Sequence, residues 1–174
     1  DKDAAELEEI TYEGYLGKGT AAIIECVTEN RNRTVADLRH ILSKGGGDLA
    51  SNGSVMWQFE RKAIYTVKSD GHNFDKAFEA ALEAGADDVT EEDGYIEIIG
   101  AAETFKDIHD SLVAARLLIE DAGLRMIPNQ EVELDFDDTI SILKLINNLE
   151  DNDDVQNVYS NLKFSDEHVE ALDS

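Results

Sequence analysis

The chain has only one cysteine, one proline and one tryptophan, and it has no long hydrophobic run. The single Cys26 excludes an intramolecular disulfide and a metal site built from several cysteines. No segment approaches the roughly 18 consecutive apolar residues of a membrane-spanning helix. The first residues show no basic stretch followed by an apolar one, the pattern of a secretory signal. We therefore expect a cytoplasmic protein with no membrane partner.

Basic side chains are also scarce. The 174 residues contain 15 lysines and arginines against 39 aspartates and glutamates, which gives a net charge of −24. Because nucleic-acid binding depends on Lys and Arg contacts with phosphates, this charge excludes a protein that coats DNA by its overall charge. The acidity is uneven: residues 10–64 carry seven basic and six acidic side chains, whereas residues 65–128 and 129–174 are strongly acidic. Residues 10–64 are therefore the candidate anion-binding segment.

Short apolar runs alternate with amphipathic segments along the chain. Runs typical of strands lie at residues 20–28, 54–59, 63–67, 95–99, 117–119, 124–127, 132–136 and 155–162. Helical spacing of apolar residues predicts helices that begin at Thr34, Phe74, Thr104 and Thr139. The mixture predicts an α+β fold with two small sheet-plus-helices domains.

The boundaries of these elements have local signals. Thr34 and Asp37 have the spacing of a capping box, and Gly45–Gly47 ends the same helix. Asp135 and its acidic neighbours are expected to cap the last long helix rather than to bind a metal. The polar residues 165–174 are expected to fray.

The residue types that carry most catalytic and metal chemistry form no cluster in the sequence. The four histidines are scattered, with no His-x-x-x-His pair. Gly17–Thr20 lacks the pattern of a phosphate-binding loop, and Asp151–Asp154 lacks the glycine and closing glutamate of an EF-hand. We expect no catalytic residue, no metal, no cofactor and no small-molecule substrate, and hence a protein that is not an enzyme.

Six of the seven basic side chains of residues 10–64 are the candidate binding residues for nucleic acid or ribosome. They are Arg31, Arg33, Arg39, Lys44, Arg61 and Lys62. Arg31 and Arg33 lie two residues apart in a predicted turn, where an extended backbone points both guanidinium groups the same way, beside the N–H groups of a helix N-terminus. The spacing is compatible with phosphate contact. It is equally compatible with ion pairs to Glu29, Asp37 or Glu60 that tie the strand to the helix.

Two aromatic residues and the cysteine lie in predicted strands. Trp57 and Phe59 alternate in the segment 54–59, where they either stack on bases or pack in the core. Cys26 lies in an apolar run and is expected to be an inert core residue.

Several longer stretches resemble the YebC/PmpR family. The most specific are Asn30–Thr34 (Asn-Arg-Asn-Arg-Thr) and Val155–Asn161 (Val-Gln-Asn-Val-Tyr-Ser-Asn). Shorter matches are Tyr12–Tyr15, Ile23–Cys26, Leu38–His40, Gly46–Leu49, Gly53–Val55, Phe59–Lys62 and Met126–Asn129. One departure is Leu16–Gly19 (Leu-Gly-Lys-Gly), where the family usually has Gly-Pro-Gly-Gly.

The resemblance implies three domains, with the third inserted into the second. A basic helical domain would precede Asp1, and residues 1–11 would be its remnant. Residues 12–62 and 129–174 would form the second domain together, and residues 63–128 would form the third.

The same resemblance implies a transcriptional regulatory protein that binds DNA in its full-length form. Some family members, including a mitochondrial translational activator of cytochrome oxidase, are tied to translation, so a ribosome-associated or RNA-associated translation factor is the alternative. An acidic protein-docking module is a second alternative.

Overall fold

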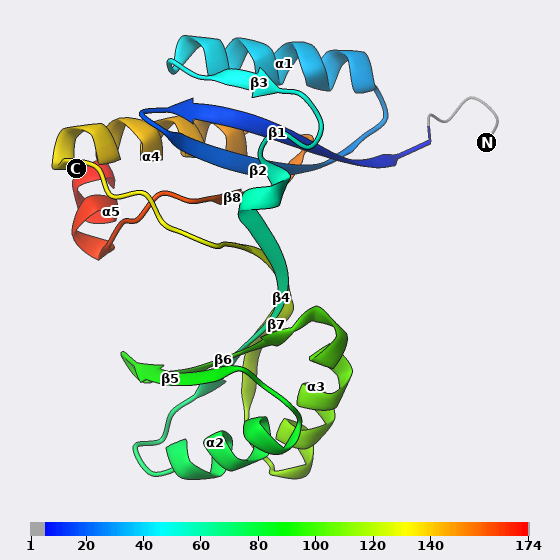
Figure 1. The fold of residues 1–174 in the computed structure, drawn as a ribbon, viewed down its shortest axis with the longest axis vertical. Coiled ribbons are helices and arrows are strands. Elements are labelled where there is room, and N and C mark those ends of the chain that lie inside the picture. The colour runs from blue at the N-terminus through cyan, green and yellow to red at the C-terminus, as the bar shows by residue number, and fades with distance from the viewer. Residues whose placement is uncertain (1–5, 174) are drawn as a thin grey trace. The chain divides into compact units, whose positions relative to one another are not determined.

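The structure, a computed structural model, describes residues 6–173 and consists of two compact units (Figure 1). The outer unit contains the residues up to Glu60 and those from Ile127 onward, and the inner unit is Arg61–Met126. Each unit has its own sheet, its own helices and its own hydrophobic core. The expected α+β class is confirmed.

The outer unit is built on a four-stranded antiparallel sheet in the order β3-β1-β2-β8. Its strands are β1 (Glu8–Gly17), β2 (Thr20–Thr28), β3 (Asp48–Ala50) and β8 (Val155–Ser160). Central strand β2 pairs with β1 on one side and with β8, from the far end of the chain, on the other. Cys26 is buried in β2, and burial raises the pKa of its thiol to about 11. The expectation that Cys26 is a core residue is therefore confirmed.

The described residues of the outer unit form three α-helices. They are α1 (Arg31–Lys44), α4 (Phe136–Glu150) and α5 (Asp166–Asp173). Leucines and isoleucines of α1 and α4 form one core with alternate residues of β2, so both helices lie on the same face of the sheet. At Gly45, the C-cap of α1, an added Cβ would lie 2.6 Å from the side chain of Leu145 on α4, so a larger residue there would displace Leu145. Helix α5 packs on α4, where the rings of Phe136 and His168 stack 5.1 Å apart.

On the opposite face of the outer sheet, the segment 51–59 covers the region around Glu13, whereas Thr11 and Tyr15 on the same face are exposed. Gly14 lies against Leu42 of α1, so its neighbour Glu13 points to the other face. The Glu13 carboxylate is buried there and accepts hydrogen bonds from the backbone N–H groups of Gly53 (2.7 Å), Val55 (2.8 Å) and Met56 (2.7 Å). Burial by itself raises the pKa of Glu13, but the three hydrogen bonds outweigh it and the pKa lies below its usual value.

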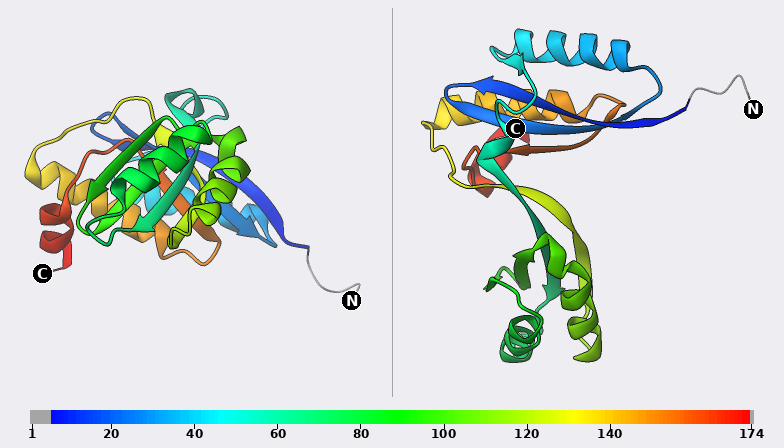
Figure 2. Two further views of the ribbon diagram at one scale, coloured as in Figure 1. Left: turned by 90° about the horizontal axis from the view of Figure 1, so that it is seen from below. Right: turned by 45° about the vertical axis from the view of Figure 1, so that its right-hand side comes forward.

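The inner unit has a second four-stranded sheet, in the order β5-β6-β4-β7. Its strands are β4 (Phe59–Lys68), β5 (Asp88–Glu92), β6 (Tyr95–Ala101) and β7 (Ile119–Pro128). Its helices are α2 (Phe74–Glu83), α3 (Phe105–Ala114) and the short 3-10 turn η2 (Ala102–Thr104). Both helices cover one face of this sheet (Figure 2), and the core between them contains Tyr65, whose hydroxyl donates to Phe105 O at 2.7 Å.

Several predicted boundaries were wrong at the N-terminal side. Residues 8–11, expected to be a remnant of a removed domain, form the start of β1 and pair with the end of β2. The rest of that expectation concerns residues 1–7, of which residues 1–5 lie outside the described chain. Helix α1 begins at Arg31 rather than Thr34, because Asn30 is the N-cap and its Oδ1 accepts a hydrogen bond from Arg33 N at 3.0 Å.

Other segments also differ from the prediction. Residues 54–59 form no strand but a turn, the 3-10 helix η1 (Met56–Gln58) and the first residue of β4. Of the runs expected at 117–119 and 124–127, only Ile119 of the first and all of the second lie in a strand, the single strand β7. The run at 132–136 contributes one bridge, Val132 to Leu162. Residues 166–173, expected to fray, form α5, whereas Asp135 caps α4 as predicted, with its Oδ1 accepting from Asp138 N at 2.8 Å.

Candidate nucleic-acid interface

The structure divides the six predicted cations between the two units. Arg31, Arg33, Arg39 and Lys44 lie on α1 in the outer unit, whereas Arg61 and Lys62 lie on β4 at the start of the inner unit. Lys62 Nζ pairs with Asp87 Oδ2 at 3.2 Å within the inner unit. Helix α1 is therefore the element that gathers most of the set.

The helical course of α1 separates the two arginines that were expected to act together. Residues two apart on a helix differ by about 200° around its axis, so Arg31 and Arg33 do not point the same way. The prediction of an extended turn with parallel guanidinium groups was wrong, because Asn30 starts the helix one residue before Arg31. Thr34, Leu38 and Leu42 form the buried stripe, and the remaining cations lie along its exposed sides.

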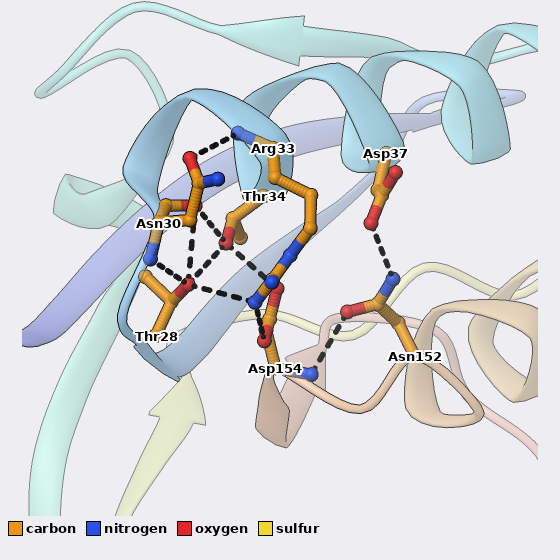
Figure 3. Close-up of polar contacts among 7 residues, drawn as sticks. All are labelled: Thr28, Asn30, Arg33, Thr34, Asp37, Asn152 and Asp154. Atoms are coloured by element: carbon orange, nitrogen blue, oxygen red, sulfur yellow. Dashed lines mark hydrogen bonds and ion pairs between the residues drawn. The ribbon is translucent and has the colours of Figure 1, made fainter. Parts of the chain in front are cut away.

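Arg33 belongs to a polar network that joins α1 to the loop before β8 (Figure 3). Its Nη2 donates to Asp154 Oδ1 at 2.8 Å, and this hydrogen bond raises the pKa of Arg33. The buried hydroxyl of Thr34 donates to Asp154 Oδ2, also at 2.8 Å. Asn152 connects to both sides of the network: its Nδ2 donates to Asp37 at 3.2 Å and its Oδ1 accepts from Asp154 N at 3.0 Å.

Arg31 is paired as well, at the surface. Its Nε lies 3.5 Å from Glu8 Oε2, and both side chains are more than half exposed. Cations in the first turn of a helix are disfavoured by the helix dipole, and α1 has no acidic residue there. The carboxylates of Glu8 and Asp154 offset this cost. Ion pairing of both arginines is thus observed, with partners other than Glu29, Asp37 and Glu60.

A depression of about 610 Å³ lies beside this network. Its lining residues are Leu7, Val27, Thr28, Glu29, Arg33, Asp37, Asn152, Asp153, Asp154 and Gln156. Four of these side chains are carboxylates and one is a cation, so the local charge repels a phosphate group. The N-terminal turn of α1 is therefore poorly suited to bind an anion.

The C-terminal half of α1 offers a different surface. Arg39, His40 and Lys44 are exposed there, and Arg39 and Lys44 have no ion-pair partner within residues 6–173. Lys44 also lies in the last turn, where the helix dipole favours a cation. His40 and Lys44 line a depression of about 350 Å³ with Asn148 of α4. These side chains are available to contact phosphates.

Trp57 and Phe59, each expected either to stack on bases or to pack in the core, have different environments. Phe59 is a core residue, whereas Trp57 is 72% exposed on η1. The sequence does not predict the role of Glu13, although its stretch Tyr12–Tyr15 and its partner stretch Gly53–Val55 both match the family. Their hydrogen bonds join residues 40 and more positions apart, for which the sequence has no local signal.

Residues 6–173 contain no group of three His, Cys, Asp or Glu side chains placed to hold a metal ion. Over the same described residues, no helix has the length and apolar character needed to cross a membrane.

A family model described as "TACO1/YebC second and third domain" matches residues 7–162. The chain belongs to this family. The match covers the outer sheet through β8, helices α1 and α4, and the whole inner unit, so the resemblance to the YebC family is confirmed.

Individual relatives agree with the family model. A "Probable transcriptional regulatory protein" of Bifidobacterium animalis subsp. lactis is 47% identical over 97% of this chain and 67% of the relative. A protein with the same description from Photorhabdus laumondii is 48% identical over 98% of this chain and 69% of the relative. The crystal structure of a conserved hypothetical protein from Aquifex aeolicus superimposes with a TM-score of 0.83 at 32% identity, over 95% of this chain and 68% of that one.

Proposed function

We propose that this chain is part of a non-enzymatic regulator of gene expression that acts in the cytoplasm and contacts DNA in its full-length form. The names of the relatives support regulation of transcription. The observation that carries the proposal is the pair of unpaired, exposed cations Arg39 and Lys44 on α1, in a chain whose net charge is −24. Arg31 and Arg33 are secondary candidates, since each already has a carboxylate partner.

The acidity sets a limit on what this chain does alone. Phosphate contacts by two to four cations have to overcome repulsion from the other acidic residues, which acts over a Debye length of about 8 Å at physiological salt. We expect residues 1–174 alone to bind duplex DNA weakly. Measurements of the function therefore belong in the full-length protein.

The test compares two charge-matched double variants of the full-length protein. Arg39→Ala with Lys44→Ala removes the free cations of α1, and Lys106→Ala with Arg125→Ala removes two cations of the inner unit that pair with aspartates. DNA affinity is measured by titration over a range of salt concentrations. The α1 variant is expected to bind more weakly and to lower the slope of log affinity against log salt by about 1.8, since each phosphate contact contributes roughly 0.9. The inner-unit variant is expected to keep the parental slope.

Co-sedimentation with ribosomes is measured on the same proteins. An α1 variant that binds DNA like the parent but no longer co-sediments with ribosomes would overturn the DNA assignment and favour the translation factor. An α1 variant unchanged in both assays would remove α1 as the contact surface.

A further inference from the structure

The only tryptophan of the chain is displayed on the surface by an ordered turn. Trp57 lies in η1 with 72% of its surface exposed, the highest value among the large apolar side chains of residues 6–173. Its indole Nε1 donates to Ser54 O at 2.9 Å. Because the N–H group is already used, the indole presents its π faces and carbon edges to a partner.

The backbone that carries Trp57 is held by polar groups on both sides. On one side, the buried Glu13 carboxylate binds the N–H groups of Gly53, Val55 and Met56. On the other side, Asn129 Nδ2 donates to Trp57 O at 3.3 Å, and Asn129 N donates to Gln58 O at 2.8 Å. A side chain fixed in this way loses little conformational entropy when a partner binds. The turn is therefore preorganised for an interaction through Trp57.

The charge near Trp57 indicates whether a nucleobase or a cationic side chain is the better partner for the indole face. Single-stranded nucleic-acid sites combine a stacking aromatic with a positively charged groove. Here the buried charge that binds the turn is the anion of Glu13 on β1, whose Oε1 lies 2.7 Å from Met56 N. No lysine or arginine of residues 6–173 forms an ion pair with Glu13. The nearest cations in the sequence, Arg61 and Lys62, each have an interaction of their own, Lys62 with Asp87 Oδ2 at 3.2 Å. With these two cations engaged, the Glu13 anion and the net charge of −24 favour a cation over a phosphate chain.

We propose that Trp57 anchors a docking site for a basic protein segment, with an arginine guanidinium of the partner stacked on the indole. Trp and Arg are both enriched among the residues that dominate protein interfaces, and Trp is the strongest cation–π acceptor. The site goes beyond the proposed DNA contact and is separate from it. Glu13 and the turn lie on the face of the outer sheet opposite α1, so variants of one surface leave the other intact.

The experiment uses the full-length protein and short peptides in which arginine or lysine alternates with serine. Affinity is measured by calorimetry, and the emission of Trp57 reports on the site directly if other tryptophans of the full-length protein are replaced. Trp57→Ala is expected to weaken binding of the arginine peptide about two- to fivefold, the effect of one exposed cation–π contact. Trp57→Phe is expected to keep part of the affinity, whereas Trp57→Leu, apolar but without a π face, is expected to behave like Trp57→Ala. Phe164→Ala, which removes another half-exposed aromatic of the outer unit, is the control and is expected to bind like the parent.

Melting temperatures separate binding from folding, and all four variants are expected to melt like the parent because the altered side chains are exposed. Equal binding of the arginine peptide by the parent and Trp57→Ala would overturn the proposal. So would retention of affinity in Trp57→Leu, since the contact would then be merely apolar. Quenching of Trp57 emission by a single-stranded oligonucleotide, with no response to the peptide, would identify a nucleobase as the occupant instead. None of these outcomes depends on whether Arg39 and Lys44 bind DNA.

Discussion

Replacing Glu13 by glutamine tests how the segment 51–59 is held against the outer sheet. The substitution keeps the size of the side chain and removes its charge. One amide oxygen remains to accept from Val55 N and Met56 N, while the amide NH2 group faces the N–H of Gly53, which also donates. The hydrogen bonds from Val55 N and Met56 N then have a neutral acceptor instead of a charged one. The contact with Gly53 N becomes one between two donors.

The magnitude follows from these three contacts. A hydrogen bond to a charged group contributes about 1.5–3 kcal/mol, and a neutral one about half as much. Because Gly53 is exposed and water can relieve its N–H group, we expect Glu13→Gln to lower the free energy of unfolding by about 2–3 kcal/mol. In a chain of this size that corresponds to a fall in Tm of about 4–12 °C. Glu9→Gln is the control, since Glu9 lies exposed on the same strand and its loss changes the charge equally.

The effect is also expected to depend on pH. The pKa of Glu13 is lower in the folded chain than in the unfolded one, so its contribution is complete above the unfolded pKa of about 4.3 and is lost as the pH falls through the folded pKa. The difference in Tm between the parent and Glu13→Gln therefore shrinks from about pH 7 to about pH 3. A variant that melts within a degree of the parent at neutral pH would refute the account of this buried carboxylate.

Two further predictions concern the polar network around Asp154 and the division of the chain into two units. Asp154→Ala removes the acceptor shared by Arg33 and the buried Thr34, and we expect it to lower the free energy of unfolding by roughly 1–2 kcal/mol and Tm by about 2–8 °C. Calorimetry should show no shift for Asp153→Ala, which removes an exposed neighbour. We also propose that the inner unit is an inserted domain. Limited proteolysis, with the fragments identified by mass spectrometry, is expected to cut near residues 62–63 or 128–129. The two outer fragments are expected to stay associated, because β2 pairs with β8 across the insertion. Outer pieces that separate under native conditions would contradict the insertion.

The sequence was sufficient where one local pattern decided the structure. Helix α2 has apolar residues at every helical position that faces the core, and the structure places it at Phe74–Glu83 as the spacing predicts. The cap of α4 at Asp135 was predictable for the same reason, since its carboxylate meets the first free N–H groups of its own helix.

The sequence was insufficient where two local solutions compete or where the deciding partner is distant. Asn30 and Thr34 are both residue types that favour the N-cap position, and in the structure Asn30 is the N-cap of α1. The Thr34 hydroxyl instead donates to Asp154, 120 positions away. The apolar residues of 54–59 are typical of a strand, but hydrogen bonds from this backbone to Glu13 bend it into a turn. Trp57 is exposed for that reason, and its candidate role became apparent only with the fold.

The pairing of β2 with β8 has a consequence for the order in which the chain acquires structure during synthesis. All strands and helices of Arg61–Met126 have been made before the first residue of β8 is added. Until residues 155–160 follow, one edge of β2 has no neighbour and the Arg33 side chain has no Asp154 to bind. Vectorial synthesis therefore favours completion of the inner unit first. The outer sheet closes last, and up to that point the uncovered edge of its most apolar strand is the part of the nascent chain most prone to wrong pairing.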